Sequence, residues 1–177
     1  MDLFLHTCCG PCACFTTQRL LEEGLEPTLF FYNPNIHPYQ EYQRRLEGLT
    51  QLANIRSLQL VQEPGYELEA FLKNVASEPQ SRCVHCYQVR LSKTAAKAKE
   101  LGFNLFSTTL LISPYQNRDL ICTIGHELAQ KYELSFYDED FRPGFRQSQV
   151  MAKEYNLYRQ GYCGCIYSEK DRYYKEN

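Results

Sequence analysis

The sequence predicts an α/β protein in which a parallel sheet is covered by helices on both faces. Short apolar segments of strand type alternate with longer segments of helical periodicity four or more times along the chain. The connections between these segments are short, which favours parallel strands with helices packed across them. At 177 residues, the chain has the size of one domain with a full hydrophobic core.

Each expected strand is an apolar run that turn residues follow. In chain order, the strands are expected at residues 3–5, 28–32, 56–61, 104–111 and 134–140. Each expected helix repeats apolar residues along one face, and the first and fourth close at Gly24 and Gly102. In chain order, the helices are expected at residues 14–27, 37–54, 65–75, 81–103, 117–132 and 147–158.

The loops after the first, second and fourth strands should converge at one edge of the sheet. They begin at Cys8, Asn33-Pro34-Asn35 and Ser113-Pro114. Ligands of open α/β sheets bind at this edge, outside the carboxyl ends of the strands. We expect the whole chain, residues 1–177, to form a single domain whose tail, from about 141 to 177, bears the last cysteines.

Composition and charge exclude several classes of protein. The sequence has no apolar run long enough for a transmembrane helix. Its first residues lack the basic region and the small-residue cleavage site of a signal peptide, so we expect a cytoplasmic protein. The net charge of −2 predicts no general affinity for polyanions, and a nucleic acid would need a local basic patch.

Nine cysteines are the most informative feature of the composition. Most of them form three tight groups, which indicates metal or redox chemistry, whereas a disulfide-stabilised secreted protein would be shorter and spread them out. Cys122 stands alone and is expected to be a small buried hydrophobe. The nine lie at positions 8, 9, 12, 14, 83, 86, 122, 163 and 165.

The first group contains Cys9-Gly10-Pro11-Cys12, the tetrapeptide of thioredoxin active sites. A helix amino terminus would lower the pKa of the first thiol and favour thiolate attack. However, Cys8 takes the place of the expected aromatic residue, and no strand–helix unit precedes the motif. Simple thioredoxin-like exchange is therefore disfavoured.

The second group, Cys83-Val84-His85-Cys86, is also predicted at a helix amino terminus. Two such pairs at one end of a sheet supply four sulfurs, which suit either zinc or an iron–sulfur cluster. Arg82 and the helix ends would offset the negative charge of the thiolates. Because a structural zinc site needs only four cysteines, the surplus favours iron–sulfur chemistry.

The third group, Cys163-Gly164-Cys165, places a single glycine between two cysteines. A disulfide across one residue is strained, and strained disulfides are readily reduced, so this pair is predicted to be redox-active. The alternatives are two further metal ligands or an inert tail.

Together these motifs resemble the epoxyqueuosine reductase QueH family. The resemblance covers nearly the whole chain in the family's order and spacing, although each piece alone is a weak signal. The matching stretches are HTCCGPC, YNPNIHPYQEYQRR, RCVHCYQVRL, STTLLISPYQN and the terminal YCGC.

The resemblance implies reduction of epoxyqueuosine at the wobble position of tRNA to queuosine. It also implies a Rossmann-like fold of the adenine nucleotide alpha-hydrolase (HUP) type and a [4Fe-4S] cluster. Cys12 stands where some members carry an Asp associated with a second iron, so its role is open between iron ligand, thiol and bystander. By the same resemblance, Cys8, Cys9, Cys83 and Cys86 look like cluster ligands, and Cys163 and Cys165 like a redox-active, disulfide-forming pair.

A tRNA substrate would have to be held by a local surface. Residues 142–162 carry a net charge of +3 and interleaved aromatic rings on which unpaired bases stack. Arg44 and Arg45 are further candidates for phosphate contacts, and the alternative is a solvated helix face with core tyrosines. The candidates within the stretch are Arg142, Arg146, Lys153, Arg159, Phe145, Tyr155, Tyr158 and Tyr162.

Four more residues flank the expected site. His6 and His37 follow the first two strands and are each either proton donors or structural histidines. Tyr115 and Gln116 follow the fourth strand and are expected to line the pocket.

Two other functions compete with this interpretation. An ATP-using tRNA-modifying enzyme of the same fold needs a phosphate loop rich in Gly and Ser, and residues 6–10 read HTCCG instead. The second alternative is a zinc-binding module that binds RNA without catalysis.

Overall fold

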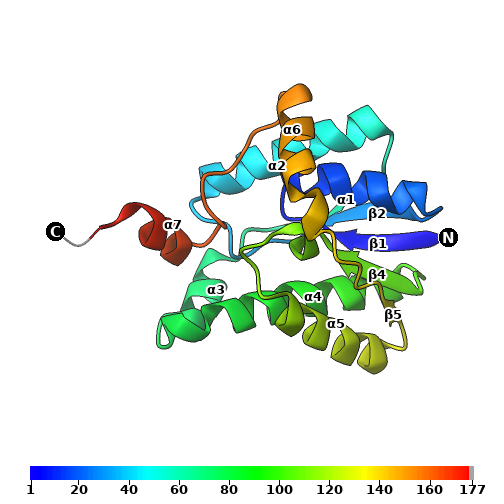
Figure 1. Ribbon diagram of the computed structural model, residues 1–177. Coiled ribbons are helices and arrows are strands. Elements are labelled where there is room, and N and C mark those ends of the chain that lie inside the picture. Colours follow the sequence, from blue (N-terminus) through cyan, green and yellow to red (C-terminus); the bar gives the residue numbers. More distant parts are fainter. Residues whose placement is uncertain (176–177) are drawn as a thin grey trace.

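The computed structural model describes residues 1–175 and contains a five-stranded parallel sheet in the order β3-β2-β1-β4-β5. The central strand, β1, pairs with β2 and with β4, so that Leu5 lies beside Leu29 on one side and Ser107 on the other. The order of the strands reverses between β1 and β4, and Figure 1 shows their carboxyl ends pointing toward the C-terminal helix. The strands are β1 (Asp2–His6), β2 (Glu26–Phe31), β3 (Leu60–Gln62), β4 (Leu105–Thr108) and β5 (Ser135–Phe136).

Helices cover both faces of the sheet, as predicted. In Figure 1, α1, α2 and α6 lie above the strands and α3, α4 and α5 lie below them. On the upper face α1 packs against α2 and α6, and on the lower face α4 packs against α5. The helices are α1 (Gly10–Glu22), α2 (Tyr39–Arg56), α3 (Leu68–Val75), α4 (Arg82–Glu100), α5 (Arg118–Tyr132), α6 (Phe145–Glu154) and α7 (Ile166–Tyr173).

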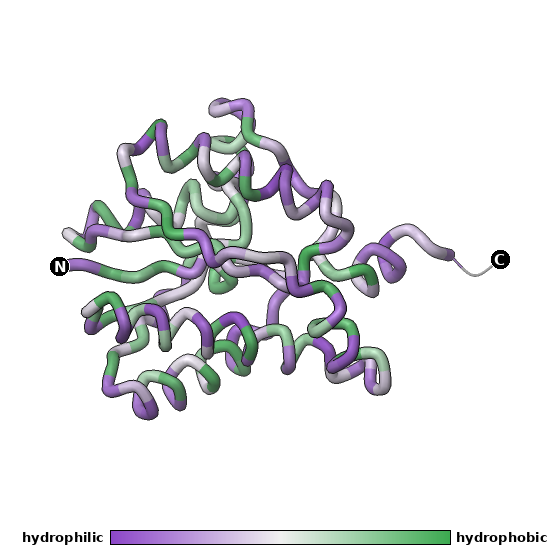
Figure 2. The backbone as a smooth tube through the Cα atoms, turned by 180° about the vertical axis from the view of Figure 1, so that it is seen from behind, coloured by the Kyte–Doolittle hydropathy of each residue, from purple (hydrophilic) through white to green (hydrophobic). Residues whose placement is uncertain are grey.

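The core lies between these layers and around the central strands. Leu3, Phe4 and Leu5 of β1 are completely buried, and the ring of Phe4 stacks on Phe30 of β2 at 5.0 Å. Burying one such side chain contributes about 1.5–3 kcal/mol. Figure 2 shows apolar residues along the inner strands and mixed polar and apolar residues along the helices, as amphipathic helices require.

The predicted elements are all present, but several boundaries differ, and β3 and β5 are shorter than predicted. β4 ends at Thr108 because its Oγ1 accepts a hydrogen bond of 3.1 Å from the Leu110 N–H and starts a 3-10 turn over Thr109–Ile112. The first helix begins earlier than predicted, at Gly10, and α6 ends earlier, at Glu154. In the tail, α7 was not predicted, and residues 176 and 177 lie outside the described part of the chain.

The start of α1 is held close to α2. A Cβ atom on Gly10 would lie 2.8 Å from the carbonyl oxygen of Gly48, so only glycine permits this approach. Pro11 follows in the first helical turn, where an N–H group would have no partner within the helix, so the N–H that proline lacks is not needed. These two residues therefore fix the position at which the first cysteine group enters the helix.

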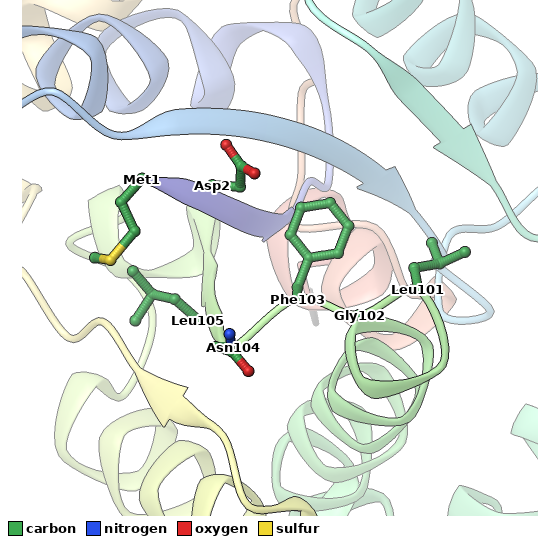
Figure 3. A pocket seen from close by; sticks show the side chains of 7 residues that line it. All are labelled: Met1, Asp2, Leu101, Gly102, Phe103, Asn104 and Leu105. Carbon is green, nitrogen blue, oxygen red and sulfur yellow. The ribbon is translucent and has the colours of Figure 1, made fainter.

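A cavity of about 350 Å³ lies at the opposite end of the sheet from the cysteines. It is lined by Met1 and Asp2 at the start of β1 and by residues 101–105, as Figure 3 shows. It is therefore separate from the edge at which sheets of this kind bind ligands. Within residues 1–175, no helix is long and apolar enough to cross a membrane.

Candidate metal and redox site

Three cysteines gather at the head of α1, where the chain leaves the central strand. Cys8, Cys9 and Cys12 are buried, and their sulfurs all lie within 4.8 Å of one another. The Cys8 and Cys9 sulfurs are 3.6 Å apart, and Cys9 is the N-cap residue of the helix. The unpaired N–H groups and the positive end of the helix dipole favour thiolates at this position. The trio is therefore a group of soft ligands ready to bind a metal.

The pKa values of the three thiols are shifted in different directions. The neighbouring Cys12 and Cys9 thiols, together with the Thr109 hydroxyl, hold the pKa of Cys8 well below its ordinary value, against the effect of burial. The same contact with Cys8 raises the pKa of Cys12, while burial raises the pKa of Cys9. Cys8 is thus the member of the trio that is most readily a thiolate.

The second cysteine pair lies in the first turn of α4, as predicted. Cys86 is buried, and burial raises its pKa to about 12, opposed by the positive charge of Arg90. Cys83 is exposed. Among the described residues, neither of these two sulfurs joins the trio within 4.8 Å.

The C-terminal pair lies beside the second pair. Cys165 is buried in a small apolar cluster that also contains Cys86 and Phe71, and its sulfur accepts a hydrogen bond of 3.3 Å from the Ser168 N–H. Cys163 is exposed, and its sulfur accepts a hydrogen bond of 3.1 Å from the Gln116 amide. All nine cysteines are free thiols.

One tail segment, residues 160–165, connects the cysteine groups. The Gln160 Nε2 lies 3.0 Å from the Cys9 sulfur and 3.9 Å from the Cys12 sulfur, while Cys165 at the other end packs with Cys86. Arg45 of α2 holds the middle of the segment by donating to the carbonyl oxygen of Cys163 at 2.7 Å. The segment therefore touches both predicted metal-binding pairs.

Sequence reasoning missed Arg90 and Gln160. Arg90 is 1% exposed and follows Cys86 by one helical turn, so helical spacing from the second pair was an available signal. Its positive charge acts on Cys86, Cys163 and Cys8, one member of each group. Gln160 reaches its sulfurs from far along the chain, and no local pattern marks it.

His6 and His37, which flank the predicted site, both make structural hydrogen bonds. Burial and the nearby Arg90 charge lower the pKa of His6 to about 3, so it is neutral, and its ring bonds to Thr108 Oγ1 and the Tyr32 carbonyl. The His37 ring bonds to the Pro34 carbonyl oxygen and to the backbone N–H of Ile166. Both histidines position backbone around the site.

Several residues predicted to contact tRNA already pair with other residues of this chain, inside the fold or at its surface. The expectation for Arg45 was wrong, because this side chain is 1% exposed and paired with Glu41 at 2.7 Å. Arg142 is paired with Asp140 at 2.7 Å. Of the tyrosines, Tyr158 donates to Glu41 at 2.5 Å, and Tyr162 donates to the carbonyl oxygen of His37. The hydroxyls of these two tyrosines therefore tie the tail to α2 and to the loop at His37.

Two further residues that the sequence singled out are Arg82 and Cys122. Arg82, which was expected to offset thiolate charge, interacts electrostatically with Cys165 and Cys83 and also forms an ion pair with Asp171 of α7. Cys122 packs against the core from a half-buried position.

The donor set fits a thiolate-bound metal centre. It combines three buried thiols at the amino terminus of α1 with a second pair at the amino terminus of α4, on the other face of the sheet (Figure 1). It also contains a buried guanidinium nitrogen, Nη2 of Arg90, that has no hydrogen-bond partner within residues 1–175.

Comparison with solved structures supports the fold. A structure titled as a predicted subunit of tRNA methyltransferase from Methanocaldococcus jannaschii matches with a TM-score of 0.58 at 13% identity, covering 87% of this chain and 76% of that one. The match supports the predicted α/β fold, in which helices cover both faces of a parallel sheet.

Comparison with known sequences shows the family. The chain is 39% identical to epoxyqueuosine reductase QueH of Dehalococcoides mccartyi over 99% of this chain and 96% of the relative. It is 35% identical to that of Thermotoga maritima, over 96% and 91% of the two chains. The family model described as "Epoxyqueuosine reductase QueH" matches residues 3–171. With its cysteine groups gathered at one edge of the sheet, the chain belongs to the epoxyqueuosine reductase QueH family.

Proposed function

We propose that this protein reduces the epoxide of epoxyqueuosine at the wobble position of tRNA and so produces queuosine. The observation that carries this proposal is the tail segment 160–165, which contacts Cys9 at one end and packs with Cys86 at the other. The tail that bears Cys163 and Cys165 thus lies beside two potential sets of metal ligands. The residues 1–177 act in this proposal as one catalytic unit, because the tail supplies part of the site.

In this proposal Cys8, Cys9, Cys83 and Cys86 hold a [4Fe-4S] cluster. Burial of the trio and the positive charge of Arg90 support thiolate ligation of an anionic group. In the same proposal Cys12, whose sulfur lies within 4.8 Å of both Cys8 and Cys9, would bind a second, mononuclear iron. When bound, such a centre supplies a Lewis acid for the departing oxygen and a route for electrons.

In this proposal, the Cys163 and Cys165 thiols supply the electrons and protons that the reaction consumes. Both carbon–oxygen bonds of the epoxide break, the two carbons form a double bond, and the oxygen takes up two electrons and two protons to leave as water. Oxidation of the Cys163 and Cys165 dithiol to a disulfide releases the same two electrons and two protons. An external dithiol then restores the pair, and Cys163 is the sulfur that such a donor can reach, because it is exposed while Cys165 is buried.

The tRNA is held in this proposal by exposed side chains at the same edge. Tyr115 is 83% exposed and precedes Gln116, whose amide touches Cys163, so its ring is available for base stacking beside the redox pair. Arg146, Lys153 and Arg159 are exposed and available to phosphates. Binding should therefore weaken steeply with salt. The thiol-rich site suits the reducing cytoplasm, where we place the reaction.

Anaerobic purification tests the metal centre. Wild-type protein should show the broad visible absorption and the iron and sulfide content of a [4Fe-4S] cluster. Substitution of Cys8, Cys9, Cys83 or Cys86 by Ser should abolish the spectrum, whereas Cys122→Ser, a half-buried cysteine outside the three groups, should leave it intact. Cys12→Ser should lower the iron content by about one atom per chain without removing the cluster spectrum. A colourless chain that contains only zinc after anaerobic reconstitution would support the zinc-binding alternative.

Turnover tests the reaction. The nucleosides of tRNA containing epoxyqueuosine should shift to queuosine when the loaded protein and a dithiol reductant are added, as measured by mass spectrometry. Cys163→Ser and Cys165→Ser should each keep the cluster spectrum and lose turnover. Full turnover in either variant with a chemical reductant would exclude the dithiol as an obligatory electron source.

A further inference from the structure

Within residues 1–175, Arg90 is a buried cation without a carboxylate partner. Its side chain is 1% exposed on α4, and its Nε and Nη1 donate to the Cys86 carbonyl at 3.3 Å and to Asn33 Oδ1 at 3.5 Å. Its Nη2 has no hydrogen-bond partner in the described part of the chain. A buried charge left in this state is strongly unfavourable, so a negative group must complete the site.

The other fully buried arginine shows what a completed site looks like. Arg45 is also 1% exposed, but its Nε pairs with Glu41 at 2.7 Å. Its two remaining nitrogens donate to the carbonyl oxygens of Cys163 at 2.7 Å and Tyr162 at 2.9 Å. Arg45 therefore has an anionic partner and a hydrogen-bond partner for every nitrogen. Within residues 1–175, Arg90 is equally buried but has no anionic partner and leaves one nitrogen without a hydrogen bond.

The ionisable groups that act on Arg90 are mostly thiols. Burial disfavours its charged form, but Cys86, Cys163 and Cys8 outweigh burial and raise the pKa of Arg90. In return, Arg90 helps to lower the pKa of His6, as a nearby fixed positive charge must. The groups that raise the pKa of Arg90 are thus three thiols and the Tyr87 hydroxyl, with no carboxylate among them.

We propose that Arg90 is the counter-cation of the thiolate-bound centre and that its Nη2–H group is donated to a sulfur of that centre. This rests on the proposed function in so far as the centre is a redox cluster. A fixed positive charge and an N–H donor stabilise the reduced, more negative form of a cluster and so raise its reduction potential. Arg90 is a positioning and tuning residue in this proposal, and it does not touch the substrate.

The test is the reduction potential of the anaerobically reconstituted full chain, measured by a redox titration followed by absorption or EPR. Arg90→Met removes the charge and the donor. At a given potential, this substitution should lower the ratio of reduced to oxidised centre at least tenfold. For a one-electron couple, a tenfold change corresponds to a fall in the reduction potential of about 59 mV. Arg90→Lys keeps the charge and should shift the potential by less than half as much. Lys93→Met removes a half-exposed positive charge from the same helix, where it pairs with Glu63, and should leave the potential unchanged.

The outcomes separate this proposal from the proposed function. A wild-type potential in Arg90→Met overturns the role of Arg90 alone. If Arg90→Met assembles no centre, Arg90→Gln, which keeps a donor without a charge, is titrated instead, and an unchanged potential there overturns the proposal equally. A wild-type chain that assembles no redox centre overturns both proposals.

Discussion

The side-chain amide of Gln116 lies 3.1 Å from the sulfur of Cys163, 47 positions further along the chain. The orientation of the amide is fixed by Tyr87. The Tyr87 hydroxyl accepts a hydrogen bond from the Asn117 N–H at 3.2 Å, so its own proton goes to Gln116 Oε1 at 2.7 Å. The amide nitrogen must then face the sulfur as a donor.

Gln116→Leu should therefore make Cys163 less reactive. A hydrogen bond of this kind contributes about 0.5–1.5 kcal/mol, which corresponds to a roughly two- to tenfold slower alkylation of Cys163 by iodoacetamide. Mass spectrometry of the modified peptide measures the rate. Tyr87→Phe frees the amide to rotate and should give an intermediate rate, and an unchanged rate in both variants would contradict this role.

Arg45→Met should destabilise the protein strongly. It leaves Glu41 buried without its ion-pair partner and frees the carbonyl oxygens of Tyr162 and Cys163. Removing one partner of a buried pair costs about 3–5 kcal/mol of unfolding free energy, which urea denaturation measures. The adjacent Arg44→Met is the matched control, because Arg44 is exposed and should change stability by less than about 1 kcal/mol.

Gly164→Ala should displace the redox pair. Gly164 has φ of 149°, and a Cβ atom there would lie 3.1 Å from Asn35 Nδ2 and 3.3 Å from Arg45 Nη1. We expect the displaced tail to expose Cys165, so that its alkylation becomes faster than in the wild type. Gly24→Ala is the control, since Gly24 also has positive φ but open space around it. It should cost about 1 kcal/mol of stability and leave Cys165 protected.

The attachment of the tail should weaken in mild acid. Burial lowers the pKa of His37, whose ring accepts a hydrogen bond of 3.3 Å from the Ile166 N–H only when neutral. Because the unfolded chain binds the proton more tightly, the contribution of His37 to stability is complete above about pH 6.5 and is lost as the pH falls through the lowered value. The free energy of unfolding by urea, measured from pH 7.5 to 5.5, should therefore fall.

His6 contributes with the same sign, because its pKa is also lowered. The variant His37→Gln isolates the contribution of His37, since glutamine offers a donor and an acceptor without titrating in this range. The fall in stability should be smaller in this variant than in the wild type. An identical fall in the two proteins would assign the effect to His6 or to other groups.

The sequence by itself determined the architecture and the places of the cysteine groups in it. Alternation of strand and helix patterns is a local property, because each element's periodicity is set by the face that it buries. Cys83 and Cys86 could therefore be placed in the first turn of a helix, and the loop at Cys8 at the carboxyl end of the central strand. The order of strands then brought these loops to one edge.

Only the tertiary structure decided which polar residues complete the site. Arg45 and Tyr158 look from the sequence like surface residues for RNA, but both bind Glu41 inside the fold. Gln160 and Arg90 reach cysteines from distant or separate elements, and such contacts depend on how helices pack rather than on local pattern. Burial then sets their role, because a buried polar group must find a partner: the Gln160 amide lies 3.0 Å from the Cys9 sulfur, and Arg90 donates to the Cys86 carbonyl oxygen and to Asn33.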